Sequence, residues 1–129
     1  EHRLVYLNHA FSTADLEWAL ATYPNVTFIN GHFFAGLRPL ANAHPRLKIC
    51  TCAGMCFRDS ERDALANPAS DVMLVGSDFG LFQLGFGVGV IAYANIPERD
   101  KEMILGLNAL AVLRRIKWFK PSMLRKSAR

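Results

Sequence analysis

Long uninterrupted hydrophobic runs are missing from this 129-residue sequence. No apolar stretch approaches the roughly 18 residues that a membrane-spanning helix needs. The nearest candidate, residues 72–96, is interrupted by Ser77, Asp78 and five glycines. The N-terminus also shows no basic segment followed by an apolar run and a small-residue cleavage site. We therefore expect a cytoplasmic protein that does not associate with membranes.

Cysteine is scarce, and its count is odd. The three cysteines form the pattern Cys50-x-Cys52-x3-Cys56, which argues against a framework of disulfides. A metal cluster is an alternative, but structural zinc sites usually have Cys-x2-4-Cys pairs with a second pair elsewhere. Because Cys50 and Cys52 lie two residues apart on an expected strand, they should point to one face and be buried as small hydrophobic residues.

Acidic residues are absent from the last part of the chain. From Arg114 onward there are seven basic residues and no acidic ones, so residues 1–113 carry a net charge of −3 within an overall charge of +4. We favour a solvated basic tail, with binding to nucleic acid or an anionic membrane as the alternative. We divide the chain into a folded domain, residues 1–115, and a basic C-terminal tail, residues 116–129, and expect no nucleic-acid partner.

Short apolar runs alternate with helix-like segments in the folded part. Strands are expected at four places: 4–7, 26–29, 47–52 and 72–75. Helices are expected between and after them: Ser12 to Tyr23, Leu37 to His44, about Asp59 to Asn67, a segment ending at Ile91, and Pro97 to Arg115. Such an alternation implies an α/β fold with a parallel sheet, whose nearly continuous apolar strands should be buried on both faces.

Two architectures fit this alternation. One is half of a (β/α)8 barrel, because a complete barrel takes about 250 residues. The other is a small open sheet of the doubly wound kind. In both, active sites form at the C-terminal ends of the strands.

Three side chains that could hold a metal ion stand at such strand ends. His9, His32 and Asp78 each follow an expected strand directly or within a few residues. Imidazole and carboxylate groups are ligands that suit zinc and related divalent ions. A single histidine at a strand end is often a structural residue, but two histidines and an aspartate at equivalent positions favour a metal site.

A glycine-rich segment follows Asp78. Gly85-Phe86-Gly87-Val88-Gly89 weakly resembles a dinucleotide-binding loop, but it lacks the full Gly-x-Gly-x-x-Gly spacing and does not follow a strand directly. We interpret it as a flexible active-site loop.

Three blocks of sequence carry a family resemblance. They are Tyr-Pro-Asn-Val-Thr-Phe-Ile-Asn-Gly-His at 23–32, Val-Met-Leu-Val-Gly-Ser-Asp-Phe at 72–79, and Ile-Leu-Gly-Leu-Asn-Ala-Leu at 104–110. In this order, they resemble the second half of amidohydrolase-superfamily enzymes, in the amidohydrolase-related branch. The resemblance covers nearly all of residues 5–115. It implies the C-terminal half, strand–helix units five to eight, of a TIM (β/α)8 barrel.

The resemblance also implies roles for the strand-end residues. His9 matches the histidine that ends strand five and binds metal. His32 matches the strand-six histidine, which binds metal or positions the attacking water and polarises the substrate. Asp78 matches the strand-eight aspartate, which binds metal and takes a proton from the bound water. All three are thus expected ligands of a divalent metal ion, with zinc as the expected ion, and His32 and Asp78 are the expected catalytic residues.

The sequence also departs from the family pattern. The His-x-His pair of strand one and any ligand from strand four have no counterpart here. Phe33-Phe34 follows His32 where the family often has smaller residues, and Gly80 follows Phe79 where proline is common. We therefore expect this chain alone to bind metal weakly and to be inactive without an N-terminal half-barrel or self-association.

The function that the resemblance implies is a metal-dependent hydrolase. Such an enzyme cleaves an amide, ester or lactone bond of a small-molecule substrate with a metal-activated water. A metal-dependent non-oxidative decarboxylase of the same family and a catalytically inactive half-barrel that self-associates are two alternatives. A third is a small α/β domain for a phosphorylated ligand, which the glycines at 85, 87 and 89 would serve.

Overall fold

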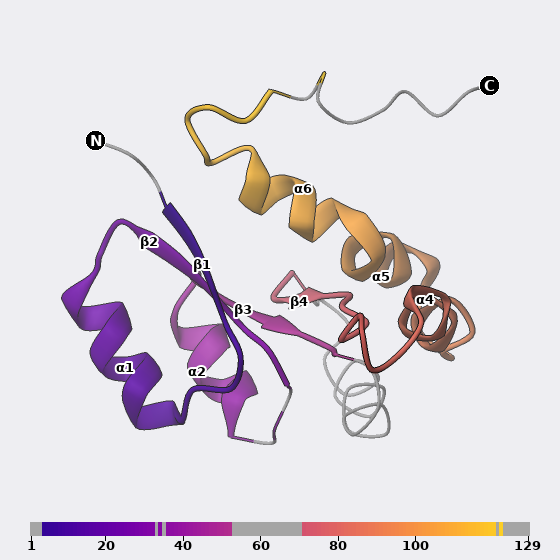
Figure 1. Cartoon of the computed structure of the whole chain (residues 1–129), viewed down its shortest axis with the longest axis horizontal. Coiled ribbons are helices and arrows are strands. Elements are labelled where there is room, and N and C mark those ends of the chain that lie inside the picture. Colours follow the sequence, from indigo (N-terminus) through magenta and orange to yellow (C-terminus); the bar gives the residue numbers. More distant parts are fainter. Residues whose placement is uncertain (1–3, 33, 35, 53–70, 121, 123–129) are drawn as a thin grey trace.

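Four parallel strands form one sheet in the computed structural model, which describes residues 4–32, 34, 36–52, 71–120 and 122. The strands lie side by side in chain order (Figure 1): β1 (Leu4–Asn8), β2 (Val26–Asn30), β3 (Leu47–Cys50) and β4 (Met73–Leu74). The expectation of a mixed α/β fold with a parallel sheet is confirmed. Because the strand order never reverses, the described sheet lacks the switch point of a doubly wound sheet.

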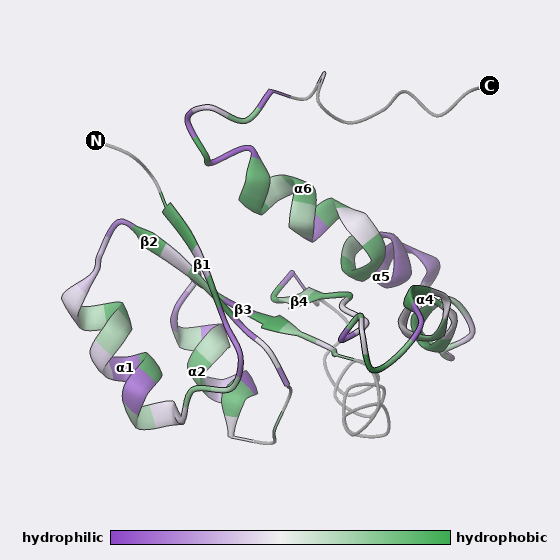
Figure 2. Cartoon of the chain, in the orientation of Figure 1, coloured by the Kyte–Doolittle hydropathy of each residue, from purple (hydrophilic) through white to green (hydrophobic). Residues whose placement is uncertain are grey.

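Helices lie beside both ends of this sheet (Figure 1). The first pair, α1 (Thr13–Thr22) and α2 (Leu37–Ala43), flanks the first three strands. Beside β4 lie the remaining ones: α4 (Leu84–Ala92), α5 (Glu98–Glu102), the π-helical turn η1 (Met103–Leu107) and α6 (Asn108–Leu113). The hydropathy of this second group is uneven, because α4 is largely hydrophobic and α5 is hydrophilic (Figure 2). The helix expected at 59–67 lies outside the described residues.

The start of α1 is fixed by its own sequence. Asp15 N–H donates to Ser12 Oγ at 3.2 Å, and Ser12 N–H donates back to the Asp15 carboxylate at 3.3 Å. This reciprocal capping box satisfies two backbone donors that would otherwise lack partners at the helix end. The helix begins as the sequence predicts, and its apolar stripe of Leu16, Ala19 and Leu20 is buried.

The core lies where the strand side chains of one face meet the helices. The strand register pairs Phe28 with Leu47 and Ile49 with Met73, and all four side chains are buried. They form one cluster with apolar residues of the flanking helices: Leu16, Leu20, Leu37, Ile91 and Ile104. Burial of these side chains supplies most of the stabilisation of the sheet.

The two edge strands of the sheet differ in how far other parts of the chain cover them. At β4, Val75 N–H donates to Ile104 O at 3.0 Å and Asn108 Nδ2 donates to Met73 O at 2.8 Å, so η1 and α6 cover the edge backbone. β1 is paired with only one strand in the described sheet, and the prediction that every strand is buried on both faces is wrong for it, because apolar side chains on each of its two faces are exposed. Its exposed apolar side chains are Leu4 (56%), Tyr6 (50%) and Leu7 (66%).

The glycine-rich segment is a helix, so the prediction of a flexible loop there is wrong. A β-carbon at Gly87 would lie only 2.8 Å from Gly76 O, whereas Gly85 and Gly89 face open space. Glycine at position 87 therefore allows α4 to approach the end of β4 closely. Within the described residues, no helix combines the length and the hydrophobicity needed to cross a membrane.

Candidate metal centre

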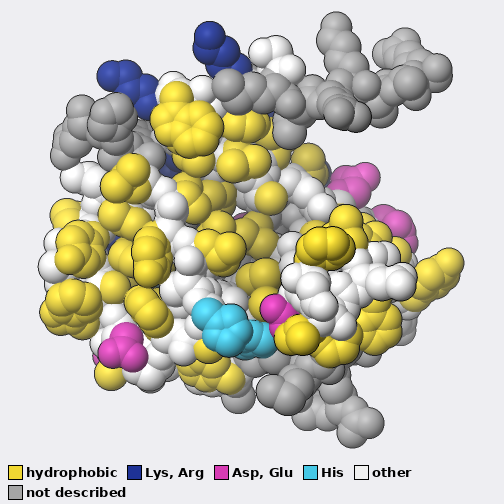
Figure 3. Space-filling model, viewed as in Figure 1, with side chains coloured by type: hydrophobic (Ala, Val, Ile, Leu, Met, Phe, Trp, Pro, Cys, Tyr) yellow, Lys and Arg dark blue, Asp and Glu magenta, His cyan; other side chains and the backbone are white. Residues whose placement is uncertain are grey.

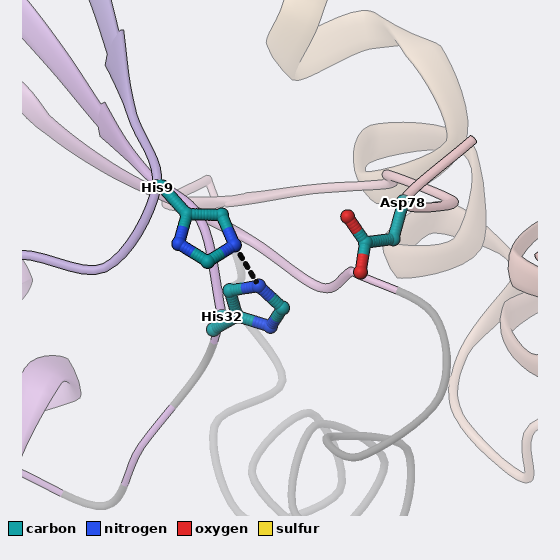
Figure 4. A group of neighbouring side chains, drawn as sticks. All are labelled: His9, His32 and Asp78. Atoms are coloured by element: carbon teal, nitrogen blue, oxygen red, sulfur yellow. Dashed lines mark hydrogen bonds between the residues drawn. The ribbon is translucent and has the colours of Figure 1, made fainter. Parts of the chain in front are cut away.

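His9, His32 and Asp78 converge at the C-terminal edge of the sheet. They follow β1, β2 and β4, respectively. Each residue offers one ligand atom, and these three atoms lie within 4.8 Å of one another. Figure 4 shows the two imidazole rings side by side and the Asp78 carboxylate facing them across a gap. The structure thus brings together the three residues singled out in the sequence.

The two histidine rings are in direct contact. Their Nε2 atoms are 2.8 Å apart, and the ring planes meet at 80°. This contact is a hydrogen bond in which one imidazole carries the Nε2 proton. Zinc bonds of ~2.0–2.1 Å in tetrahedral geometry would separate neighbouring ligand atoms by roughly 3.3 Å. An ion would therefore replace the shared proton after the rings part slightly and the carboxylate moves inward.

The group is accessible from solvent on one side. His9 is exposed, whereas His32 and Asp78 are half-buried. The histidine side chains lie at the surface next to an acidic side chain (Figure 3). Two imidazoles and one carboxylate with an open side match the three protein ligands and free position of catalytic zinc sites.

A buried pair of asparagines holds the loops that carry the histidines. Asn8 and Asn30 are paired in the strand register, and their side-chain amides hydrogen-bond to each other. Phe11 N–H also donates to Asn30 Oδ1 at 3.0 Å, and Asn30 Nδ2 donates to Gly31 O at 3.1 Å. Sequence reasoning missed this support. The available signal was that each histidine follows a strand-end asparagine, in Asn8-His9 and Asn30-Gly31-His32.

Gly31 lets the ends of β1 and β2 approach each other. Its N–H donates to Asn8 O at 2.8 Å. A β-carbon at this position would lie 3.1 Å from Asn8 O and 3.3 Å from His9 O, closer than ordinary packing allows. Glycine here therefore keeps His32 near His9.

Unusual backbone conformations gather at the same edge of the sheet. His32 (φ 58°), Cys52 (φ 42°) and Asp78 (φ 54°) are the non-glycine residues with positive φ in the part of the chain that the structure describes. They lie after β2, β3 and β4, respectively. This left-handed conformation costs a non-glycine residue about 1–2 kcal/mol. Such strain tends to cluster at functional sites.

A pair of cysteines lies directly behind His32. His32 N–H donates to Cys52 Sγ at 3.3 Å, and Cys52 Sγ is 3.6 Å from Cys50 Sγ. The two thiols share one face, as the sequence predicts, with Cys52 buried and Cys50 half-buried. The hydrogen bonds from Cys50 and from His32 N–H lower the pKa of Cys52 to about 6. The same bond to Cys52, together with burial, raises the pKa of Cys50.

Two comparisons with known protein sequences gave no match. No protein-family model matches the sequence, and no curated protein matches it. The interpretation of the site therefore depends on its geometry and on the chemistry of its side chains.

Proposed function

We propose that this chain is the C-terminal part of a metal-dependent hydrolase of the amidohydrolase type, acting on an amide, ester or lactone bond of a small molecule. The observation that supports this proposal most is the convergence of His9, His32 and Asp78 from three strand ends, with ligand atoms within 4.8 Å. These side chains are distant in sequence. Their meeting at the edge where parallel α/β sheets form active sites favours a shared chemical role.

The donor set fits a divalent ion such as zinc. Two imidazole nitrogens and a carboxylate oxygen are borderline and hard donors, a mixture that zinc accepts readily. When bound, such an ion polarises a substrate carbonyl and lowers the pKa of a water molecule.

Each of the three residues would then have its own role in the reaction. The Asp78 carboxylate faces the imidazoles (Figure 4), where it can accept a proton from the attacking water and pass it to the leaving group. His32 is half-buried, and its backbone N–H bonds to Cys52 Sγ, which holds its backbone in place at the end of β2, where the imidazole could bind the ion or polarise the substrate. His9 is exposed and lies at the rim of the site.

The strand order supports a barrel-like context for this site. Each crossover leads to the next strand in the same direction, as in the (β/α)8 barrel, where this chain would supply units five to eight. Among the described residues, no strand pairs with the outer backbone edge of β1, where a further strand could add. The edge of β4 is occupied by Ile104 and Asn108, so closure there would require these two hydrogen bonds to be replaced.

A self-associating module is the second candidate. It is favoured by exposed apolar side chains in two places, namely on β1 (Leu4, Tyr6 and Leu7) and around the start of α4 (Phe79, Leu81, Leu84 and Phe86). Apolar surface of this kind, next to an open strand edge, promotes pairing with another chain. A monodisperse dimer in sedimentation that forms equally well with and without zinc, and has no hydrolase activity, would support this second candidate.

Activity is best tested in the gene product that contains this chain. We expect hydrolysis of a panel of amides, esters and lactones to require zinc, to stop after chelation, and to be lost in Asp78→Asn. Asp71→Asn is the matched control, because Asp71 is an exposed aspartate before β4 that lies outside the site. Full activity of Asp78→Asn would contradict the proposal.

A further inference from the structure

Two sulfur atoms lie close together at the end of β3. Cys50 Sγ and Cys52 Sγ are 3.6 Å apart, and the two residues are separated by a single residue. A disulfide bond requires a sulfur–sulfur distance of about 2.05 Å, so the two atoms need to move by roughly 1.5 Å in total. Rotation about the Cα–Cβ bonds of the two short side chains is the motion that would close this distance.

The neighbouring strand leaves room for this pair. Any side chain at Gly76, which follows β4, would overlap Cys50 Sγ. Glycine at this position therefore provides the space in which the Cys50 sulfur lies. Thr51, between the two cysteines, is anchored to the same residue, because Gly76 N–H donates to Thr51 Oγ1 at 3.2 Å. The segment that carries both thiols is thus anchored to the end of β4, with the Cys50 sulfur in the space that Gly76 leaves open.

The surroundings of the pair are not those of inert buried cysteines. Cys50 is only half-buried, and Cys52 Sγ accepts a hydrogen bond from a backbone N–H rather than packing solely among apolar atoms. A small oxidant can therefore reach one sulfur, and the second sulfur is already within contact distance of the first.

We propose that Cys50 and Cys52 form a redox-active dithiol that small peroxides oxidise to an intramolecular disulfide. In the first step, one thiol takes an oxygen atom from hydrogen peroxide, which gives a sulfenic acid and one water. In the second step, the other thiol attacks that sulfur, the S–S bond forms, and the sulfenic oxygen leaves as a second water. Two electrons pass from the two sulfurs to the peroxide, and an external dithiol reverses the reaction.

Oxidation of the two cysteines would also weaken metal binding at the neighbouring site. This consequence rests on the proposed function. Formation of the S–S bond draws Cys52 Sγ toward Cys50 and away from the N–H of His32. His32 is held at a φ of 58°, so the loss of this contact allows its backbone to relax and its ring to turn. We expect zinc to bind about 10–100-fold more weakly to the oxidised chain, a loss typical of disturbed outer-shell contacts.

The disulfide is tested by treating the folded chain with hydrogen peroxide and then alkylating the remaining thiols under denaturing conditions. All three cysteines fall in one tryptic fragment, residues 49–58, so the decisive sample is Cys56→Ser, which has a single possible intrachain pair. In this variant we expect the chain to lose two hydrogen atoms in mass, both thiols to resist alkylation, and a reducing dithiol to restore them. Alkylation of both thiols after peroxide treatment, or a linkage only between chains, would overturn the proposal.

Two further measurements test the sulfenic acid intermediate and the effect of oxidation on zinc binding. The double variant Cys52→Ser,Cys56→Ser keeps Cys50 as its single thiol, so it should form no intrachain disulfide, and its half-buried Cys50 should accumulate a sulfenic acid that dimedone traps. The unsubstituted chain gives the same information about pairing by fragment sequencing, should a variant fail to fold. Zinc affinity is then compared in oxidised and reduced Cys56→Ser. Equal affinities overturn the coupling to His32, whereas the absence of zinc binding in both states contradicts the proposed function and leaves the disulfide result standing.

Discussion

The Nε2 atoms of His9 and His32 lie 2.8 Å apart although the two residues are 23 positions apart in the sequence. The parallel register of β1 and β2, which pairs Asn8 with Asn30, brings the two strand ends level. Without an ion, the rings share a proton. An ion at this place needs both Nε2 atoms as electron-pair donors, so the ring that carries the Nε2 proton must first shift it to its own Nδ1.

Substitution of Asp78 by asparagine should weaken zinc binding strongly. Asparagine tolerates the left-handed backbone found at this position, so the fold should persist while the anionic ligand is lost. We expect a loss greater than the roughly 10–100-fold typical of outer-shell changes. Isothermal titration calorimetry checks this result, with Asp71→Asn as the control that should keep the original affinity. Equal affinities for the two variants would exclude Asp78 as a ligand.

Removal of the Asn30 side chain should destabilise the chain. Asn30 is fully buried, and its loss leaves the Asn8 amide and Phe11 N–H without the partner they have now. We expect Asn30→Ala to lower the free energy of unfolding by about 1–3 kcal/mol, the cost of leaving buried polar groups unsatisfied. Asn95→Ala, at an exposed position, should change it by less than ~0.5 kcal/mol. Urea denaturation compares them, and equal effects would contradict the role assigned to the asparagine pair.

The location of the candidate site could be predicted from the sequence. Apolar runs of strand length end near His9, His32 and Asp78, and parallel strands bring their carboxyl ends to a single edge. The capping box at Ser12 likewise marked the start of α1, because it depends only on residues three positions apart. These features depend on local pattern or on the general geometry of parallel sheets.

Other features depend on register and on tertiary neighbours, which a single sequence does not reveal. β1 lies at the sheet edge and is exposed on both faces, whereas its apolar sequence resembles that of a buried central strand. The helical state of α4 was missed because its glycines predict a loop, although Gly87 serves a close approach to Gly76. The contact of Cys52 with His32 required the structure, since β2 and β3 had to be aligned first.

Replacing Gly87 or Gly89 of α4 by alanine should change the stability of the chain in opposite directions. At Gly87 a methyl group would collide with Gly76 O, a backbone atom that cannot rotate away, so we expect destabilisation by about 1–3 kcal/mol. At Gly89 nothing lies within 4 Å, and alanine should stabilise the helix by about 0.5–1 kcal/mol. Thermal unfolding of both variants checks the signs. A stabilising Gly87→Ala would mean that α4 does not approach the end of β4.

The reactivity of Cys52 should follow its lowered pKa. Because that pKa is about 6, the thiolate predominates at pH 7 and is lost as the pH falls below 6. We expect the rate of Cys52 alkylation by iodoacetamide to rise with a midpoint near pH 6 in metal-free Cys56→Ser, followed by mass spectrometry. In the Cys50→Ala,Cys56→Ser double variant the main cause of the shift is removed, so the midpoint should move toward the ordinary value of about 8.5. Identical midpoints in the two proteins would show that Cys50 does not stabilise the thiolate.

The elements that bind the ion decide whether His9, His32 and Asp78 form a metal centre. X-ray absorption spectroscopy of the reduced chain loaded with one equivalent of zinc distinguishes nitrogen and oxygen ligands at ~2.0–2.1 Å from sulfur at ~2.3 Å. If His9, His32 and Asp78 hold the ion, the first shell contains nitrogen and oxygen only, and the histidine signal falls in His32→Ala. A sulfur shell, or a spectrum that His32→Ala leaves unchanged, would place the ion elsewhere and rule out a metal centre at these three residues.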